Sequence, residues 1–134
     1  MRTALRRVRG IACAGFVSLL ISVDSYGSAP QCHPYNGSWY CQYDGRVRQA
    51  YINAYQQVIL YFDTPLNIAD ATAVGASGVT VNSAAVYNMG SNPDFGKALF
   101  AAMLTAQARG VTVSVQMSSV SGGYLTIDRI WVNE

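Results

Sequence analysis

The sequence predicts a small, mainly β domain with one α-helix, in the order three strands, one helix and two strands. Three observations lead to this prediction. Residues 91–117 have the pattern of a capped helix, a glycine and an alternating strand. Runs rich in β-branched and aromatic residues precede this stretch, and another, YLTIDRIWV, follows it. The chain has no internal repeat and no regular alternation of strands and helices, which argues against a parallel α/β sheet.

Residues 1–29 have the layout of a secretory signal peptide. Four arginines precede an apolar run at 11–21, and small residues follow at 25–29. The apolar run is too short to span a membrane comfortably. We expect cleavage after Gly27 or Ala29, with Gly27 preferred because Pro30 is a poor first residue. The mature chain would then be periplasmic or extracellular, and an uncleaved anchor is the alternative.

Removing this segment changes the charge of the protein. The whole chain has a formal net charge of +2, but residues 30–134 hold five basic and six acidic residues. A mature chain with a charge of about −1 has no basic surface typical of nucleic-acid binding. Residues 30–134 are enough for one domain with one core, and they contain no predicted membrane span.

The first part of this domain is predicted to be a disulfide loop. Cys32 and Cys41 are the two cysteines beyond the signal segment, and an even number in an exported chain favours a disulfide. It would close the loop CHPYNGSWYC and stabilise the fold by roughly 2–3 kcal/mol. Metal binding with His33 is the alternative, but this ligand set is thin. We expect no metal and no cofactor. Asn36 begins a glycosylation acceptor pattern.

Three strands are predicted before the helix. An Asp44–Gly45 turn comes first, and a strand at 46–53 follows it. The run QQVILYFD at 56–63 has the length and composition of a strand buried on both faces. Residues 66–77 form a loop with a short helical turn at Asp70, and the third strand covers 79–88.

The helix is predicted at 93–109. Asn92, or the serine before it, caps the first turn, and Pro93 suits the first helical position. Asp94 and Arg109 complement the two ends of the helix dipole, and Gly110 ends the helix.

This helix is apolar over most of its circumference, which is typical of a helix with two buried faces. The second face is covered either by a long loop or by another subunit. The expected core face contains Phe95, Leu99, Ala102, Met103 and Ala106, and the second face contains Lys97, Phe100 and Leu104.

Two strands follow the helix, at 111–117 and 124–132. The alternation of the last strand slips near Asp128 and Arg129, which predicts a β-bulge. The resulting order of elements matches an OB-fold-like five-stranded barrel with its helix between the third and fourth strands. An α+β sandwich with the same order is the alternative.

The runs PDFGKALFAAMLTAQARGVTVSV and GGYLTIDRIWV resemble the helix and closing strands of the OB-fold B subunits of AB5-type bacterial toxins. This group includes the subtilase, pertussis-like and cholera-like binding subunits. The resemblance covers roughly the last forty residues and lies in the type and length of the elements. It implies a ring-shaped pentamer that binds cell-surface glycans, with its helices lining a central pore. The chain lacks a second cysteine pair and a recognisable glycan-binding motif, so no binding residues are carried over.

Four aromatic residues cluster around the disulfide loop: Tyr35, Trp39, Tyr40 and Tyr43. Tyr and Trp combine an apolar face with a polar group, so this cluster is the best candidate for contact with a sugar or a partner protein. The alternative is that these rings cover the open end of the barrel.

An enzyme is not expected. His33 is the only histidine, and it lies in the predicted disulfide loop. Asp63 and Asp128 fall at strand positions that explain them as edge or turn residues. No glycine-rich phosphate loop follows a strand. The sequence therefore predicts a secreted or periplasmic, non-catalytic binding module that recognises a glycan or an exported partner protein. By resemblance, this module is similar to a toxin B subunit and forms a ring oligomer. The alternative is a monomeric periplasmic OB-fold accessory protein of the cell envelope.

Overall fold

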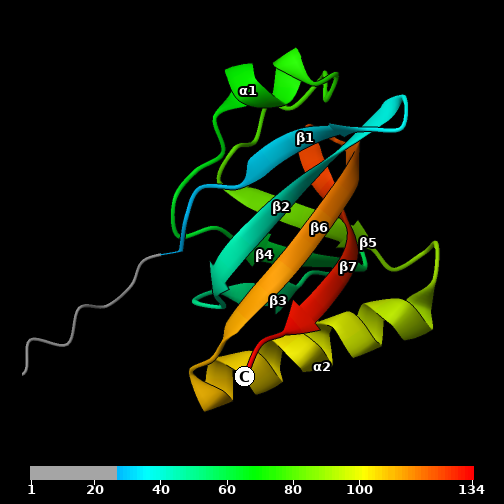
Figure 1. The fold of residues 1–134 in the computed structure, drawn as a ribbon. Coiled ribbons are helices and arrows are strands. Elements are labelled where there is room, and N and C mark those ends of the chain that lie inside the picture. The colour runs from blue at the N-terminus through cyan, green and yellow to red at the C-terminus, as the bar shows by residue number, and fades with distance from the viewer. Residues whose placement is uncertain (1–26) are drawn as a thin grey trace, which may run out of the picture.

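The computed structural model describes residues 27–134 (Figure 1). Most of the predicted signal peptide lies outside these residues. The described part contains seven strands and two helices: β1 (Gln31–Tyr35), β2 (Ser38–Arg46), β3 (Ala50–Ile52), β4 (Gln57–Tyr61), α1 (Ile68–Ala73), β5 (Ala84–Asn88), α2 (Pro93–Arg109), β6 (Thr112–Ser121) and β7 (Tyr124–Val132). Among these elements, no helix is long and apolar enough to cross a membrane.

The seven strands form one sheet in the order β1-β2-β6-β7-β5-β4-β3. Every pair is antiparallel except β5 and β7. Strand β2 is second in this order and β3 is last, yet only residues 47–49 connect them. Five strand spacings in a flat sheet would separate them by about 24 Å, whereas so short a connection spans about 14 Å at most. The sheet is therefore strongly curved.

The prediction of a mainly β domain with one long helix is confirmed, but seven strands replace the expected five. The difference lies in residues 31–53. The expected disulfide loop is a β-hairpin, and its turn is Asn36–Gly37, whose φ angles are 45° and 77°. Positive φ at both positions is typical of a two-residue hairpin turn. Asp44 and Gly45 lie inside β2, so the turn predicted there is wrong, and the strand predicted at 46–53 is reduced to β3.

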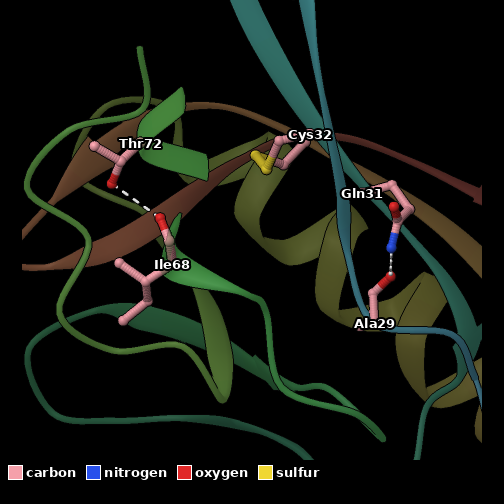
Figure 2. Close-up of a disulfide and its surroundings, with 6 residues drawn as sticks. Ala29, Gln31, Cys32, Ile68 and Thr72 are labelled. Atoms are coloured by element: carbon pink, nitrogen blue, oxygen red, sulfur yellow. Dashed lines mark hydrogen bonds between the residues drawn. A yellow bond between two sulfur atoms is a disulfide. The ribbon is translucent and has the colours of Figure 1, made fainter. Parts of the chain in front are cut away.

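The predicted disulfide joins this hairpin across its two strands. Cys32 is directly opposite Cys41 in the ladder, and their Cα atoms are 3.9 Å apart. Cys41 is fully buried, and Ile68 and Thr72 of α1 lie close to the disulfide in the view of Figure 2. The short helical turn expected near Asp70 is α1.

Helix α2 has the predicted caps. Asn92 Oδ1 accepts a hydrogen bond from the Phe95 N–H (3.1 Å), Pro93 is at the helix start, and Gly110 ends the helix with a φ of 67°. The helix packs across the ends of several strands, below the sheet in Figure 1, while α1 lies at the opposite end. Its buried residues are Gly96, Leu99, Met103 and Ala106, whereas Phe95 and Ala102 are half-buried.

The β6–β7 ladder contains two irregularities. Gln116 pairs with Arg129, but the next residue, Met117, pairs with Ile127, so Asp128 is an extra residue in β7. Farther along the ladder, Ser118 is an extra residue in β6. The β-bulge predicted near Asp128 is therefore confirmed, and a second irregularity lies next to it.

Candidate functional site

A pocket of about 390 Å³ lies where the β1–β2 hairpin meets the irregular part of the β6–β7 ladder. Its lining combines aromatic rings with short polar and charged side chains. The hairpin contributes Tyr35, Ser38, Trp39 and Tyr40, β6 contributes Gln116 and Ser118, and β7 contributes Asp128 and Arg129. The structure thus brings together three of the four aromatic residues predicted as ligand contacts.

The aromatic side chains that line the pocket are supported by contacts with the core and with one another. Trp39 is half-buried and packs against the core, and a Cβ at Gly75 would lie 3.5 Å from its ring. Tyr35 is 62% exposed and makes an edge-to-face contact with Tyr40, with ring centroids 6.1 Å apart. Tyr40 also contacts the ring of His33 at 5.3 Å. These contacts restrict the rings while leaving aromatic surface exposed in the pocket.

The fourth predicted aromatic residue, Tyr43, belongs to the core. Its side chain is fully buried and packs against Phe62, with ring centroids 5.1 Å apart. Its hydroxyl donates to the Arg46 carbonyl (3.2 Å) and accepts from the Asp63 N–H (3.3 Å). Tyr43 therefore does not line the pocket with the other three aromatic residues. In β2 it shares the inward face with Cys41, a period of two that the sequence already contains.

The charged side chains of the pocket form an ion pair between neighbours in sequence. Nε and Nη2 of Arg129 lie 2.8 Å and 2.6 Å from the same oxygen, Oδ2 of Asp128. Neighbouring side chains in a regular strand point to opposite faces. The extra residue in β7 removes this alternation, so both side chains reach the same pocket. The slip in alternation predicts the bulge, but no pattern in the sequence assigns Asp128 and Arg129 to this pocket.

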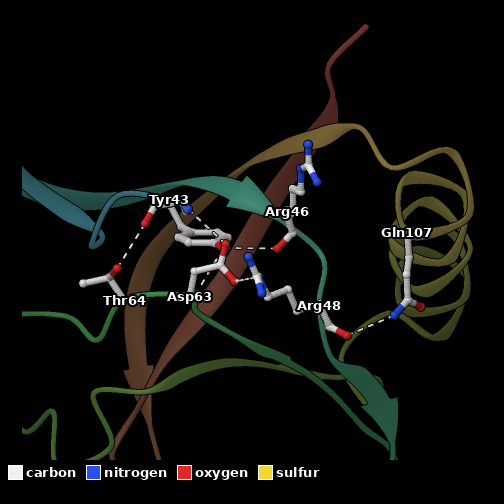
Figure 3. A network of polar contacts seen from close by, with 7 residues as sticks. Tyr43, Arg46, Arg48, Asp63, Thr64 and Gln107 are labelled. Atoms are coloured by element: carbon white, nitrogen blue, oxygen red, sulfur yellow. Dashed lines mark hydrogen bonds and ion pairs between the residues drawn. The ribbon is translucent and has the colours of Figure 1, made fainter. Parts of the chain in front are cut away.

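A second cavity, of about 260 Å³, lies between the β2–β3 connection and the end of α2. The polar groups near it hold chain segments together (Figure 3). The Asp63 side chain is almost fully buried, with Oδ1 2.7 Å from Arg48 Nε. Its Oδ2 accepts from the N–H of Gly27 at 3.0 Å, a contact that the expected cleavage after Gly27 would remove. Gln107 Nε2 donates to the Arg48 carbonyl at 3.0 Å, which ties the connection to α2. These contacts link separate segments of the chain, so we interpret this region as one that stabilises the fold.

The predicted oligomer face of α2 is divided by the structure. Phe100 is half-buried and packs against the core of its own domain. Leu104 is 44% exposed, and Lys97 is exposed with its amino group 3.6 Å from Asp94. Leu104 is consequently the large apolar residue of that predicted face that remains accessible.

Asp63 and Asp128, which the sequence explains as edge or turn residues, lie in different surroundings. Asp63 belongs to the buried network with Arg48, and Asp128 lines the aromatic pocket. In residues 27–134 no group of three or more His, Cys, Asp or Glu side chains could hold a metal ion.

Comparison of the chain with protein-family models, curated proteins and solved structures gives no match.

Proposed function

We propose that this chain is an exported, non-catalytic binding module that recognises a saccharide in the pocket between the β1–β2 hairpin and the β6–β7 bulges. The observation that carries this proposal is the composition of the pocket, in which the exposed Tyr35 and the half-buried Trp39 and Tyr40 line the same pocket as amide, hydroxyl and ion-paired side chains. A sugar ring has an apolar face that packs against aromatic rings. Its hydroxyl groups need hydrogen-bond donors and acceptors at its rim.

The curved sheet supports an OB-like fold as the scaffold of this module. We take β2 and β3 as two halves of one bent strand, because three residues connect them and they pair with opposite ends of the remaining sheet. The order of elements then becomes three strands, α2 and two strands, with β1 and α1 as additions. The disulfide supports an oxidising compartment, as expected for an exported chain.

Saccharide binding is tested with a glycan array, followed by calorimetric titration of the glycans that bind. Tyr35→Ala removes an exposed ring of the pocket, and Tyr55→Ala removes an 85% exposed ring that does not line it. We expect about tenfold weaker binding for Tyr35→Ala, the usual magnitude for one aromatic contact, and unchanged binding for Tyr55→Ala. Equal effects of the two substitutions, or no glycan bound by the wild-type protein, would contradict the proposal.

A further inference from the structure

We propose that the pocket selects neutral saccharides with two adjacent hydroxyl groups and discriminates against acidic glycans. This inference rests on the saccharide-binding function proposed above. It derives from the Asp128–Arg129 ion pair, which supplies the charged side chains of the pocket lining.

The ion pair leaves one acceptor and several donors available to a ligand. Both contacts from Arg129 converge on Oδ2 of Asp128. Within residues 27–134, no side-chain hydrogen bond or ion pair involves Oδ1. A guanidinium group has five N–H donors in a fixed plane, and this contact engages only the Nε and Nη2 side of that plane. The side chains of Asp128 and Arg129 are 39% and 56% exposed, so a ligand can reach both.

An acceptor beside a donor is complementary to two adjacent hydroxyl groups. One hydroxyl donates to Oδ1 of Asp128, and its neighbour accepts from the Arg129 guanidinium. Gln116, which pairs with Arg129 across the ladder, and Ser118 add further hydrogen-bonding groups on the same side of the pocket. The exposed ring of Tyr35 then remains for the apolar face of the sugar.

The same ion pair disfavours an anionic ligand. One cation and one anion in the lining give the pocket no net charge, because Asp128 offsets the charge of Arg129 at 2.6–2.8 Å. A carboxylate of a ligand would have to displace Asp128 from Arg129 or lie beside it. Two neighbouring carboxylates repel one another, and such like-charge contacts act against the wrong partner.

The β-bulge holds this arrangement before any ligand binds. Asp128 and Arg129 are consecutive residues in β7, Arg129 pairs with Gln116 of β6, and the ion pair links the two side chains directly. Groups held in this way lose less conformational freedom on binding than separate flexible side chains would.

The experiment compares methyl glycosides by calorimetric titration against the purified protein. The panel contains neutral hexosides, their deoxy analogues lacking one hydroxyl of an adjacent pair, and uronic and sialic acid glycosides. We expect the neutral hexosides to bind most tightly, with an affinity that changes little with salt. A deoxy analogue should bind about tenfold more weakly, since it loses one hydrogen bond to a charged group of the ion pair.

Asp128→Asn is the decisive variant, and Asp94→Asn on α2 is its control, because Asp94 is exposed and lies outside the pocket. We expect Asp128→Asn to weaken the neutral hexosides about tenfold and to strengthen the acidic glycosides, because Arg129 then lacks its counter-ion. Arg129→Lys retains the charge without the planar donors, and should also weaken the neutral hexosides. Circular dichroism verifies that each variant is folded.

The outcomes separate this inference from the function on which it rests. Tighter binding of acidic glycosides by the wild-type protein, or neutral binding that is unchanged in both pocket variants, overturns the inference. If either result occurs and saccharide binding still depends on Tyr35, the proposed saccharide-binding function is retained. If no saccharide in the panel or on the array binds, both proposals fail.

Discussion

The buried hydroxyl of Tyr43 provides a quantitative test of the core. Tyr43→Phe keeps the ring contact with Phe62 and removes the hydrogen bonds to the Arg46 carbonyl and from the Asp63 N–H. A typical intramolecular hydrogen bond contributes about 1 kcal/mol, and a buried group left unpaired adds to the loss. At neutral pH we therefore expect the free energy of unfolding to fall by about 2–3 kcal/mol.

The same residue predicts a pH dependence. Burial is the main cause that raises the pKa of Tyr43 to about 12, from an ordinary value of 10.0. Above pH 10 the unfolded tyrosine loses its proton while the folded one retains it, so stability falls by about 1.4 kcal/mol per pH unit. This contribution is fully present below pH 10 and is lost as the pH rises through about 12. The Phe variant lacks it, and its deficit relative to the wild type should shrink over this range.

Urea unfolding, followed by circular dichroism between pH 7 and pH 12, measures both effects. The pKa of Tyr51 is also raised, through its hydrogen bond with Tyr61, so the difference between wild type and variant isolates Tyr43. Tyr55→Phe is the matched control, because that ring is 85% exposed. Equal stability of Tyr43→Phe and wild type at neutral pH, or a constant difference from pH 7 to pH 12, would refute this account of the buried hydroxyl.

Three further predictions concern the hairpin, the glycines and the oligomeric state. Replacing both Cys32 and Cys41 by Ala should lower the free energy of unfolding by about 2–3 kcal/mol, because the loop becomes unconstrained in the unfolded chain; an unchanged urea midpoint would contradict this. Gly45→Ala places a Cβ against the phenol ring of Tyr43 and should lower the free energy of unfolding by about 1–3 kcal/mol. Its control, Gly110→Ala, meets open space and should cost only about 1 kcal/mol, for its positive φ; a smaller loss at the first glycine would argue against close packing there. If the protein forms a ring, Leu104→Lys should dissociate it without unfolding it, as measured by light scattering, and a strictly monomeric wild-type protein rules the ring out.

The parts of the fold that the sequence predicts correctly depend on local signals. The start of α2 follows from Asn92 and Pro93, and its end follows from Gly110. The bulge at Asp128 follows from a break in the two-residue period of a single strand. In each case the determining residues are adjacent in the chain, so no knowledge of the other strands is needed.

The sequence does not predict the hairpin, because it contains two competing turn signals. Asn36–Gly37 lies within the disulfide loop, and Asp44–Gly45 lies eight residues later. The structure uses the first as the turn and extends β2 through the second. Pairing of β2 with β6 favours this result, because Asp44 and Gly45 then gain ladder partners. A turn at Asp44 would lose that pairing. The stabilisation from the pairing depends on β6 residues about 70 positions away, so it cannot be predicted from the sequence around Asp44.

The sequence predicts only part of the candidate site, because the remaining residues come from distant segments. The aromatic cluster of Tyr35, Trp39 and Tyr40 is close in sequence, and its members do meet. Asp128 and Arg129 join them only through the register of β2 on β6 and of β6 on β7. No pattern within either segment specifies that register, so the polar half of the pocket required the structure.

The order of the strands also has a consequence for how the chain acquires its structure. The β1–β2 and β3–β4 hairpins pair residues close in sequence and can form early. Cys41, in contrast, pairs with Met117, and β5 obtains its second neighbour only from β7. Ladders between such distant segments are slow to form, because a long loop must be closed first. We therefore expect the emerging polypeptide to remain without a closed core until β6 and β7 have been synthesised.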